Sequence, residues 1–303
     1  MSIAKTIDLS IKFNETGASN EGKSYILSDR QYENYIDNEN WSAFVEEMKT
    51  KYPLAYTEYG EGSGDELGIK KVGKYPPKMA SYGSSSRMIY LLSRDIDGFQ
   101  FEKKLPTTVG GIANMDGFLQ SQNIQFFIEA KCREPFSPKS YIIDRKYETL
   151  YRYIDAEPSV DIKCNITIID DEKMHVQFVA QGTIITAFDI KQMISHLLGI
   201  ATNKINNPTE EKIKFLYLLY NPTSIRIVNP KHTEKIMAAY NVQVSECNSI
   251  PFANLFGVVI DYLHDIKSVG NANEQEINII KSVFDFELCD QNNFKQIINP
   301  YEL

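Results

Sequence analysis

The sequence predicts an α/β fold in which helices flank a mixed β-sheet. Two observations support this prediction: the order helix, strands, helix, strand along residues 84–220, and two pairs of apolar runs joined by polar turns. With 303 residues, 43% of them hydrophobic, the chain can bury a continuous core. We expect one compact unit made of an N-terminal lead-in (residues 1–60), a core (61–222) and a mainly helical C-terminal extension (223–303).

The first elements follow from apolar spacing and from turn residues. Apolar residues alternate over Ile7–Phe13, and a helix is expected over Asn40–Lys51, where apolar residues recur at helical spacing. Glycine and proline are frequent in Tyr59–Leu67 and Gly73–Met79, which predicts loops. A second helix is expected over Ser84–Asp95, with a serine as its N-cap.

Two antiparallel hairpins are predicted next. Ile112–Gln120 and Ile124–Arg133 are separated by three polar residues, and Val160–Ile169 and His175–Gln181 flank a second polar turn. Later elements are predicted from apolar periodicity and from the acidic composition beyond residue 231. They are a helix over Asp189–Lys204, an apolar strand at Ile213–Tyr220, and helices over Thr233–Tyr240, Phe252–Ile266 and Glu274–Phe284.

Composition excludes several protein classes. No apolar stretch approaches the roughly 18 residues of a membrane span, and Met1–Phe13 lacks the apolar region of a secretory signal. We therefore expect a cytoplasmic protein without a membrane partner. The cysteines lie far apart without a C-x-x-C pair, which favours buried, reduced thiols over a zinc site or a disulfide framework. They are Cys132, Cys164, Cys247 and Cys289.

The net charge of −8 hides an asymmetry along the chain. Residues 67–152 hold 14 Lys/Arg against 8 Asp/Glu, whereas residues 1–66 hold 6 against 13 and residues 153–303 hold 12 against 19. A basic middle third inside an acidic chain can bind phosphate groups, or it can be a solvated face. Charge alone leaves both interpretations open.

Residues that could bind a metal ion or take part in catalysis lie close together in the first predicted hairpin. On a strand, residues i and i+2 share a face, so Glu129 and Lys131 project together while Ile128 and Ala130 point to the opposite, packed side. If the preceding strand pairs with this one, Asp116 lies beside them. Two carboxylates can hold Mg²⁺ through oxygen, and an adjacent lysine can orient water or stabilise developing charge at a phosphate.

An acid two residues before a lysine is a common pattern in this chain. Glu129 differs from most other instances because it continues an apolar run, where a charged pair is costly unless it has a role. The nearest alternative is Asp161-Ile-Lys163, with Asp144 upstream. That strand alternates more regularly, so its charges can simply face water.

Asp116, followed after a hairpin by Glu129-Ala-Lys131, with a helix before and a helix–strand pair after, resembles the PD-(D/E)XK nuclease superfamily of the restriction-endonuclease-like fold. Met115 replaces the proline of the motif's name. Five segments in order resemble a bacterial branch of that superfamily more closely, and the resemblance covers about residues 60–222. These segments are Gly64-Asp-Glu-Leu67, Pro76-Pro-Lys-Met79, Ser84-Ser-Ser86, Phe101-Glu-Lys-Lys-Leu-Pro106 and Glu129-Ala-Lys-Cys-Arg-Glu-Pro-Phe136.

The resemblance implies a nuclease that depends on Mg²⁺, with Mn²⁺ as a substitute, and hydrolyses phosphodiester bonds in DNA. It implies that Asp116 and Glu129 are metal ligands and that the backbone carbonyl of Ala130 supplies a third oxygen. It also implies that Lys131 is the catalytic lysine. Restriction-like folds often act as dimers, so a homodimer is expected as well.

Several further residues have two interpretations. An additional acid often joins such sites, and Glu66 and Glu102 are both candidates, although either can be a surface glutamate. Gln192 and His196 share a helix face. They either reach the site or form hydrogen bonds with other groups near the core.

The tyrosines between the basic residues can stack on bases or form a packed helix face. They are Tyr141, Tyr147, Tyr151 and Tyr153. The alternative to an enzyme is a catalytically silent module that keeps the nuclease fold and binds nucleic acid or protein.

Overall fold

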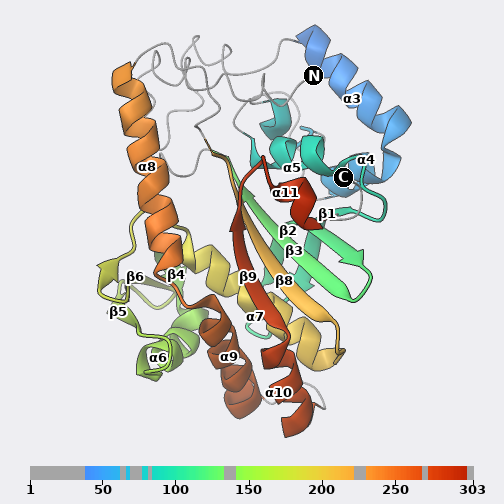
Figure 1. Cartoon of the computed structure of the whole chain (residues 1–303). Coiled ribbons are helices and arrows are strands. Elements are labelled where there is room, and N and C mark those ends of the chain that lie inside the picture. Colours follow the sequence, from blue (N-terminus) through green and yellow to red (C-terminus); the bar gives the residue numbers. More distant parts are fainter. Residues whose placement is uncertain are drawn as a thin grey trace.

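A five-stranded mixed sheet forms the centre of the protein (Figure 1). The structure is a computed structural model that describes residues 38–61, 66–68, 77–80, 84–132, 141–221, 230–267 and 272–298. The strand order is β1 (Gln100–Pro106), β2 (Ile112–Ser121), β3 (Ile124–Lys131), β8 (Lys212–Leu219) and β9 (Phe284–Cys289). Strands β1, β2 and β3 form an antiparallel meander, whereas β3, β8 and β9 run parallel.

Helices cover both faces of this sheet. The first face carries α3 (Asn38–Lys51), α4 (Pro53–Glu61), α5 (Ser85–Ser93) and α11 (Phe294–Ile298). Their apolar residues share a core with Phe126 and Ile128 of β3. The second face carries α7 (Ile190–Asn206) and α9 (Phe252–Tyr262), which share another core with Phe127 and Phe215. Strand β3 is therefore buried on both faces, as a central strand with a parallel neighbour should be.

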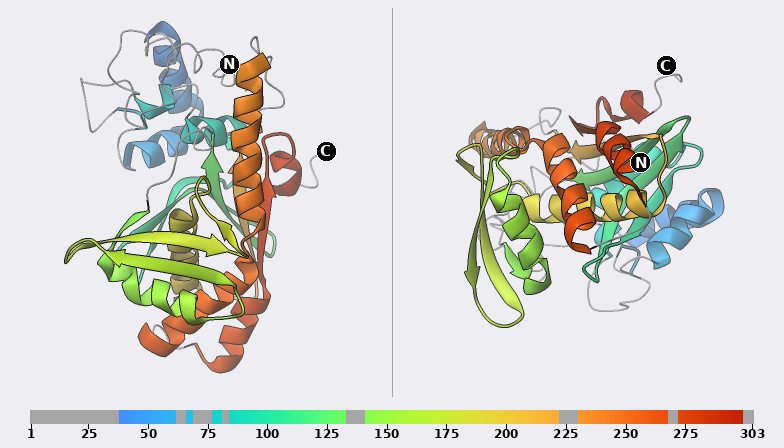
Figure 2. Two further views of the ribbon diagram at one scale, coloured as in Figure 1. Left: turned by 90° about the vertical axis from the view of Figure 1, so that its left-hand side faces the viewer. Right: turned by 90° about the horizontal axis from the view of Figure 1, so that it is seen from below.

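A second, smaller sheet is inserted between β3 and α7. Its antiparallel strands are β4 (Ile142–Asp144), β5 (Ile162–Ile168), β6 (Lys173–Ala180) and β7 (Thr183–Ile184), with β6 between β4 and β5. Helix α6 (Glu148–Ala156) packs on β5 and on α9, and α9 packs on α7. These helices lie between the two sheets (Figure 2). The chain also forms α8 (Pro230–Asn248), α10 (Glu274–Ser282) and short turns of helix at Lys78–Ala80, Arg145–Tyr147 and Leu263–Lys267.

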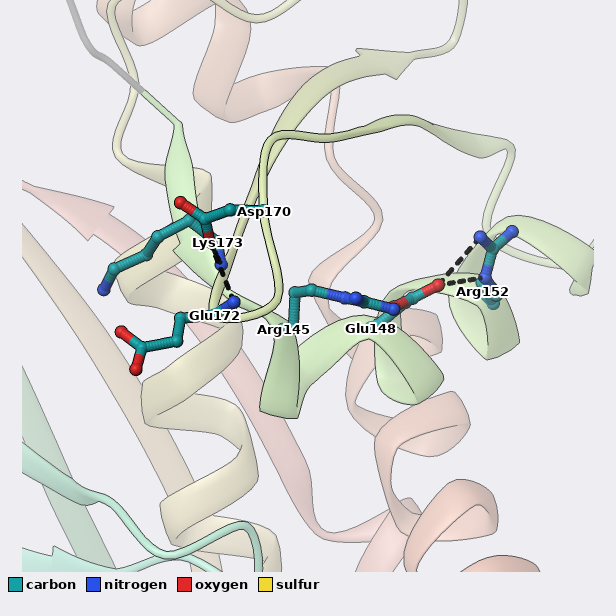
Figure 3. Close-up of polar contacts among 6 residues, drawn as sticks. All are labelled: Arg145, Glu148, Arg152, Asp170, Glu172 and Lys173. Carbon is teal, nitrogen blue, oxygen red and sulfur yellow. Dashed lines mark hydrogen bonds and ion pairs between the residues drawn. The ribbon is translucent and has the colours of Figure 1, made fainter.

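Hydrogen bonds fix the start of α6 against the turn between β5 and β6 (Figure 3). The Asp170 carboxylate accepts bonds of 2.8 and 2.7 Å from two backbone N–H groups of that turn. The backbone N–H of Arg145 donates to the carbonyl of Glu172 at 2.8 Å. Glu148 accepts bonds from the guanidinium groups of Arg145 and Arg152, at 3.1 and 2.8 Å. The beginning of α6 is thus tied to the second hairpin.

The α/β class and the mixed sheet flanked by helices are confirmed, and both predicted hairpins form. Helices α5 and α7 begin after the N-caps Ser84 and Asp189, whose side chains accept backbone bonds from Arg87 and Gln192. All four cysteines are buried and lie outside any disulfide. None of the described helices is long and apolar enough to cross a membrane.

In other places the elements differ from the predictions. Tyr59–Glu61 form the end of α4 rather than a loop, and β1 has no counterpart among the predicted elements. The second hairpin belongs to its own sheet. The described part of the C-terminal region is mainly helical, as expected, but residues 284–289 form β9 and add a strand to the central sheet. Strands β1 and β9 are sheet edges with partly exposed side chains. Strand β1 lacks a simple apolar alternation, whereas in β9 Phe284, Phe286 and Leu288 alternate with acidic residues. The Ile7–Phe13 alternation lies outside the described residues.

Candidate active site

Three acidic residues, Glu102, Asp116 and Glu129, occupy neighbouring positions along β1, β2 and β3. The β1–β2 register pairs the residues on either side of Glu102 with those on either side of Asp116, so these two acids oppose each other. The β2–β3 ladder ends with the pair Gly117 and Ile128, and Asp116 and Glu129 are the residues that follow this pair. The Asp116 carboxylate accepts a 2.7 Å hydrogen bond from the backbone N–H of Ala130, which ties it to β3.

Glu102 has a left-handed backbone, with φ of 53°. In the described part of the chain it is the only non-glycine residue with a positive φ inside a strand. Phe101 and Leu105 belong to cores on opposite faces of the sheet, although regular alternation puts them on one face, so β1 changes its facing near Glu102. The N–H of Phe101 donates to Glu58 of α4 at 2.8 Å. Such conformations cost free energy and collect at functional sites.

Lys131 extends from the end of β3 toward α7. Its ammonium group forms an ion pair with Glu129 and donates a 2.7 Å hydrogen bond to Oε1 of Gln192. One turn along α7, Nδ1 of His196 lies 3.5 Å from Oε2 of Glu129. Burial, followed by the charge of Lys131, lowers the pKa of His196 to about 3, so this imidazole is neutral. Gln192 and His196 therefore reach the candidate site.

Glu66 joins the same cluster from the segment before α5. Its carboxylate is buried and lies 3.2 Å from Nζ of Lys78, while its backbone carbonyl accepts a 3.0 Å bond from the N–H of Met79. Its charge also raises the pKa of Glu102. The structure therefore brings both candidate acids, Glu66 and Glu102, to the site.

The clustered carboxylates concentrate negative charge. Burial and, after it, the charges of Asp116 and Glu66 raise the pKa of Glu102 to about 8, against the opposing effect of Lys78. Without a cation, Glu102 is therefore largely protonated at neutral pH. A divalent cation would offset this repulsion, which is the electrostatic property expected of a site for a hard metal ion.

The residue types at this site fit Mg²⁺, because carboxylate oxygens are its preferred protein ligands. The described residues nevertheless contain no group of three or more His, Cys, Asp or Glu side chains arranged to hold a metal ion. Asp116 accepts the bond from β3, Glu129 pairs with Lys131, and Glu66 pairs with Lys78. The carboxylate oxygens and their negative charge thus suit a divalent cation. In this structure, however, the side chains contact other protein groups instead of surrounding a common metal position.

The alternative acid–lysine motif lies in the second sheet. Asp161 and Lys163 are exposed, and Nζ of Lys163 donates to the carbonyl of Asp155 at 3.1 Å. Asp144 forms an ion pair with Lys173. These charges face solvent, as the regular alternation of that strand predicts.

As the hairpin pattern predicts, Asp116, Glu129 and Lys131 lie close together. Their roles in metal binding and catalysis stay predictions, as does the role of the Ala130 carbonyl. Sequence reasoning missed Lys78 and Glu58. Lys78 lies in the Pro-Pro-Lys-Met segment and could have been paired with the acid of the Glu-Leu segment, whereas no pattern identified Glu58.

No family model, curated protein or solved structure matches this chain. The fold and the site define its class as a mixed α/β protein with a partly buried acidic cluster beside a buried lysine. The resemblance to the PD-(D/E)XK nucleases stays a prediction.

Proposed function

We propose that the protein is a divalent-metal-dependent nuclease that hydrolyses phosphodiester bonds in DNA. The observation that carries this proposal is the buried Lys131, which is held by Glu129 and Gln192 and follows directly after Ala130, whose backbone N–H donates to Asp116. Burying charged groups is costly, and such clusters are typical of functional sites.

The arrangement of elements supports a restriction-endonuclease-like core. Helix α5, the antiparallel strands β1, β2 and β3, helix α7 and the parallel strand β8 follow one another in the order that the resemblance implies. The second sheet is an insertion between β3 and α7. A homodimer, also implied by the resemblance, stays a prediction.

The acidic residues would hold the metal. Asp116, Glu129 and the Ala130 carbonyl would bind Mg²⁺, or Mn²⁺ in its place, and Glu66 and Glu102 add negative charge around them. When bound, the ion supplies Lewis-acid polarisation of the phosphoryl group.

The lysine acts on the phosphate. Lys131 provides a positive charge where negative charge develops during phosphodiester hydrolysis. Gln192 orients the ammonium group by accepting its 2.7 Å hydrogen bond. His196 is neutral, so it adds no second positive charge beside Glu129.

Cleavage of DNA by the purified protein tests this function. Supercoiled plasmid, linear duplex and single-stranded DNA are incubated in Mg²⁺, in Mn²⁺ and in EDTA. We expect cleavage in either metal and none in EDTA, with a loss of roughly 100-fold or more in Asp116→Asn. Circular dichroism establishes that the variant is folded. Failure to cut any of the three substrates in either metal contradicts the proposal.

A second candidate function is the catalytically silent binding module. It is favoured by the absence, within the described residues, of three ligand side chains already arranged around a metal position. Calorimetric titration of Mn²⁺ separates the two functions. Binding that is lost in Asp116→Asn supports the nuclease, and DNA binding without any uptake of Mn²⁺ supports the silent module.

A further inference from the structure

A cavity of about 360 Å³ opens beside the candidate active site. Its walls come from the start of β2, the first turns of α7 and the segment around the start of α6. Gln192 and His196 line it, and these residues also approach Lys131 and Glu129. A group bound in this cavity therefore lies next to the proposed site of hydrolysis.

The lining of the cavity combines aromatic rings with polar groups. The partly exposed ring of Tyr147 lies 6.3 Å from that of Tyr151, measured between centroids, and Nζ of Lys146 lies 5.4 Å from the Tyr147 centroid. Asn114 contributes an amide and Ser195 a hydroxyl. A planar heterocycle can stack on such a ring and form hydrogen bonds through its edges.

The tyrosine-bearing wall is held in place by its surroundings. Arg145, directly before Lys146 and Tyr147, is fixed to the β5–β6 turn and to Glu148, and Glu148 is fixed in turn to Arg152 (Figure 3). The wall is thus part of the folded framework, which favours a preformed binding site.

The lining of the cavity also includes apolar and charged side chains. Ile112, which lines it, is 57% exposed. Lys191 also lines it and donates to the carbonyl of Ile142 at 3.1 Å, and its charge lies near enough to Asp144 to help lower the pKa of that carboxyl. The acidic lining residue Asp189 caps α7 by accepting the N–H of Gln192 at 3.2 Å. This combination suits a nucleotide whose base lies inside and whose phosphate lies outside.

We propose that the cavity takes an unpaired nucleobase from the nucleotide next to the cleaved phosphate, so that the preferred substrate is single-stranded or locally unpaired DNA. The inference rests on the proposed nuclease function and adds a substrate class to it. A base inside a duplex is stacked and paired, and it cannot enter a cavity unless it is first flipped out of the helix.

Fluorescence anisotropy tests this proposal in EDTA, so that binding is measured without cleavage. The probes are a short fluorescein-labelled single strand and the matching duplex. Ser195→Phe fills the cavity, and Tyr147→Ala removes the stacking ring while enlarging it. Asn203→Phe is the matched control, since Asn203 is also a partly exposed polar residue of α7 but lies outside the cavity lining.

We expect the single strand to bind more tightly than the duplex. Each cavity variant weakens single-strand binding roughly tenfold, and Asn203→Phe leaves it unchanged. Thermal unfolding followed by circular dichroism reports whether each variant is folded, and the two cavity variants change its volume in opposite directions. Single-strand binding that is the same in wild type and in the folded cavity variants overturns the proposal.

The experiments can contradict the cavity proposal and the proposed nuclease function independently of each other. Metal-dependent cleavage together with unchanged binding in both cavity variants overturns the cavity proposal alone. Cavity-dependent binding of the single strand without cleavage in Mg²⁺ or Mn²⁺ overturns the nuclease function and leaves a nucleobase-binding site.

Discussion

Glu102 combines two properties that are unfavourable to the folded chain on its own. Its backbone is left-handed, and its pKa is raised to about 8 by burial and by the neighbouring acids Asp116 and Glu66. Both properties become useful if the cluster binds a cation, because the cation compensates the assembled charge. This residue therefore links the conformation of β1 to the proposed chemistry.

The pKa of Glu102 predicts how stability depends on pH without metal. A carboxyl group whose pKa is higher in the folded than in the unfolded chain stabilises the fold fully below its ordinary pKa of 4.5, and this contribution is lost as pH rises toward 8. In EDTA we expect this contribution to lower the free energy of unfolding by a few kcal/mol between about pH 5 and about pH 8, since one pKa unit corresponds to about 1.4 kcal/mol. The lowered pKa of His196 acts in the opposite direction below its ordinary pKa of 6.5. Glu102→Gln should flatten this slope. Urea unfolding at both pH values measures it, and an equally steep slope in Glu102→Gln contradicts the assignment.

Periodicity alone was enough to predict part of the site. A two-residue repeat placed Glu129 and Lys131 on one face, and the hairpin placed Asp116 beside them. The same reasoning could not choose between Glu66 and Glu102, because the position of Glu66 depends on its tertiary contact with Lys78. The left-handed conformation of Glu102 has no local signal in its sequence.

Helix α7 packs closely on β1 and β2 of the central sheet, and this packing sets how near its polar residues lie to the candidate site. A Cβ atom added at Gly199 would lie 2.7 Å from Cβ of Ala113 and 3.1 Å from Cβ of Leu105. Only glycine lets the helix lie this close to β1 and β2. The same helix carries Gln192 and His196 to the site.

Gly199→Ala should destabilise the protein by about 1–3 kcal/mol because it overpacks this contact. The effect opposes the helix propensity of alanine, which is better than that of glycine by about 1 kcal/mol. The control is Gly257→Ala on α9, where the nearest contact of an added Cβ is 4.0 Å away at Lys281, and this variant should be at least as stable as wild type. Chemical denaturation compares the three proteins. Equal stabilities of the two variants would count against the close packing.

The elements predicted from sequence are those with strong local patterns. The β2–β3 hairpin and α7 have apolar spacing that their burial reproduces. Strand β1 was missed because Glu102 interrupts its alternation, so its place in the sheet depends on its neighbours more than on its own residues. Strand β9 was missed although Phe284, Phe286 and Leu288 alternate with Asp285 and Glu287, a local signal that sequence reasoning could have used.

For the whole molecule, the C-terminal region is part of the core. Strand β9 pairs with β8, and Leu255, Phe256 and Val259 of α9 are buried in the core that contains α7. Glu246 of α8 accepts four hydrogen bonds from Thr186, Ala187 and Phe188. The segment that leads into α7 is therefore fixed by the C-terminal region.

Deletion of residues 223–303 should prevent cooperative folding of the remainder. The deletion exposes the edge of β8 and the apolar residues that α9 covers, and it leaves the N–H groups before α7 without Glu246. Thermal unfolding by circular dichroism and limited proteolysis compare the truncated and full chains. A sharp melting transition with a protease-resistant core in the truncated chain would show that the C-terminal region is dispensable for folding.

The most direct test of the proposed active site compares Lys131→Met with Lys163→Met. Both lysines follow an acid by two residues, but Lys131 is buried beside the carboxylates and Lys163 is exposed on β5. The measurement is the rate of cleavage, in Mg²⁺, of the DNA that the wild type cuts fastest. We predict a rate roughly 100- to 1,000-fold lower for Lys131→Met and an unchanged rate for Lys163→Met. Equal cleavage by folded Lys131→Met and by wild type would contradict the assignment of catalysis to this site.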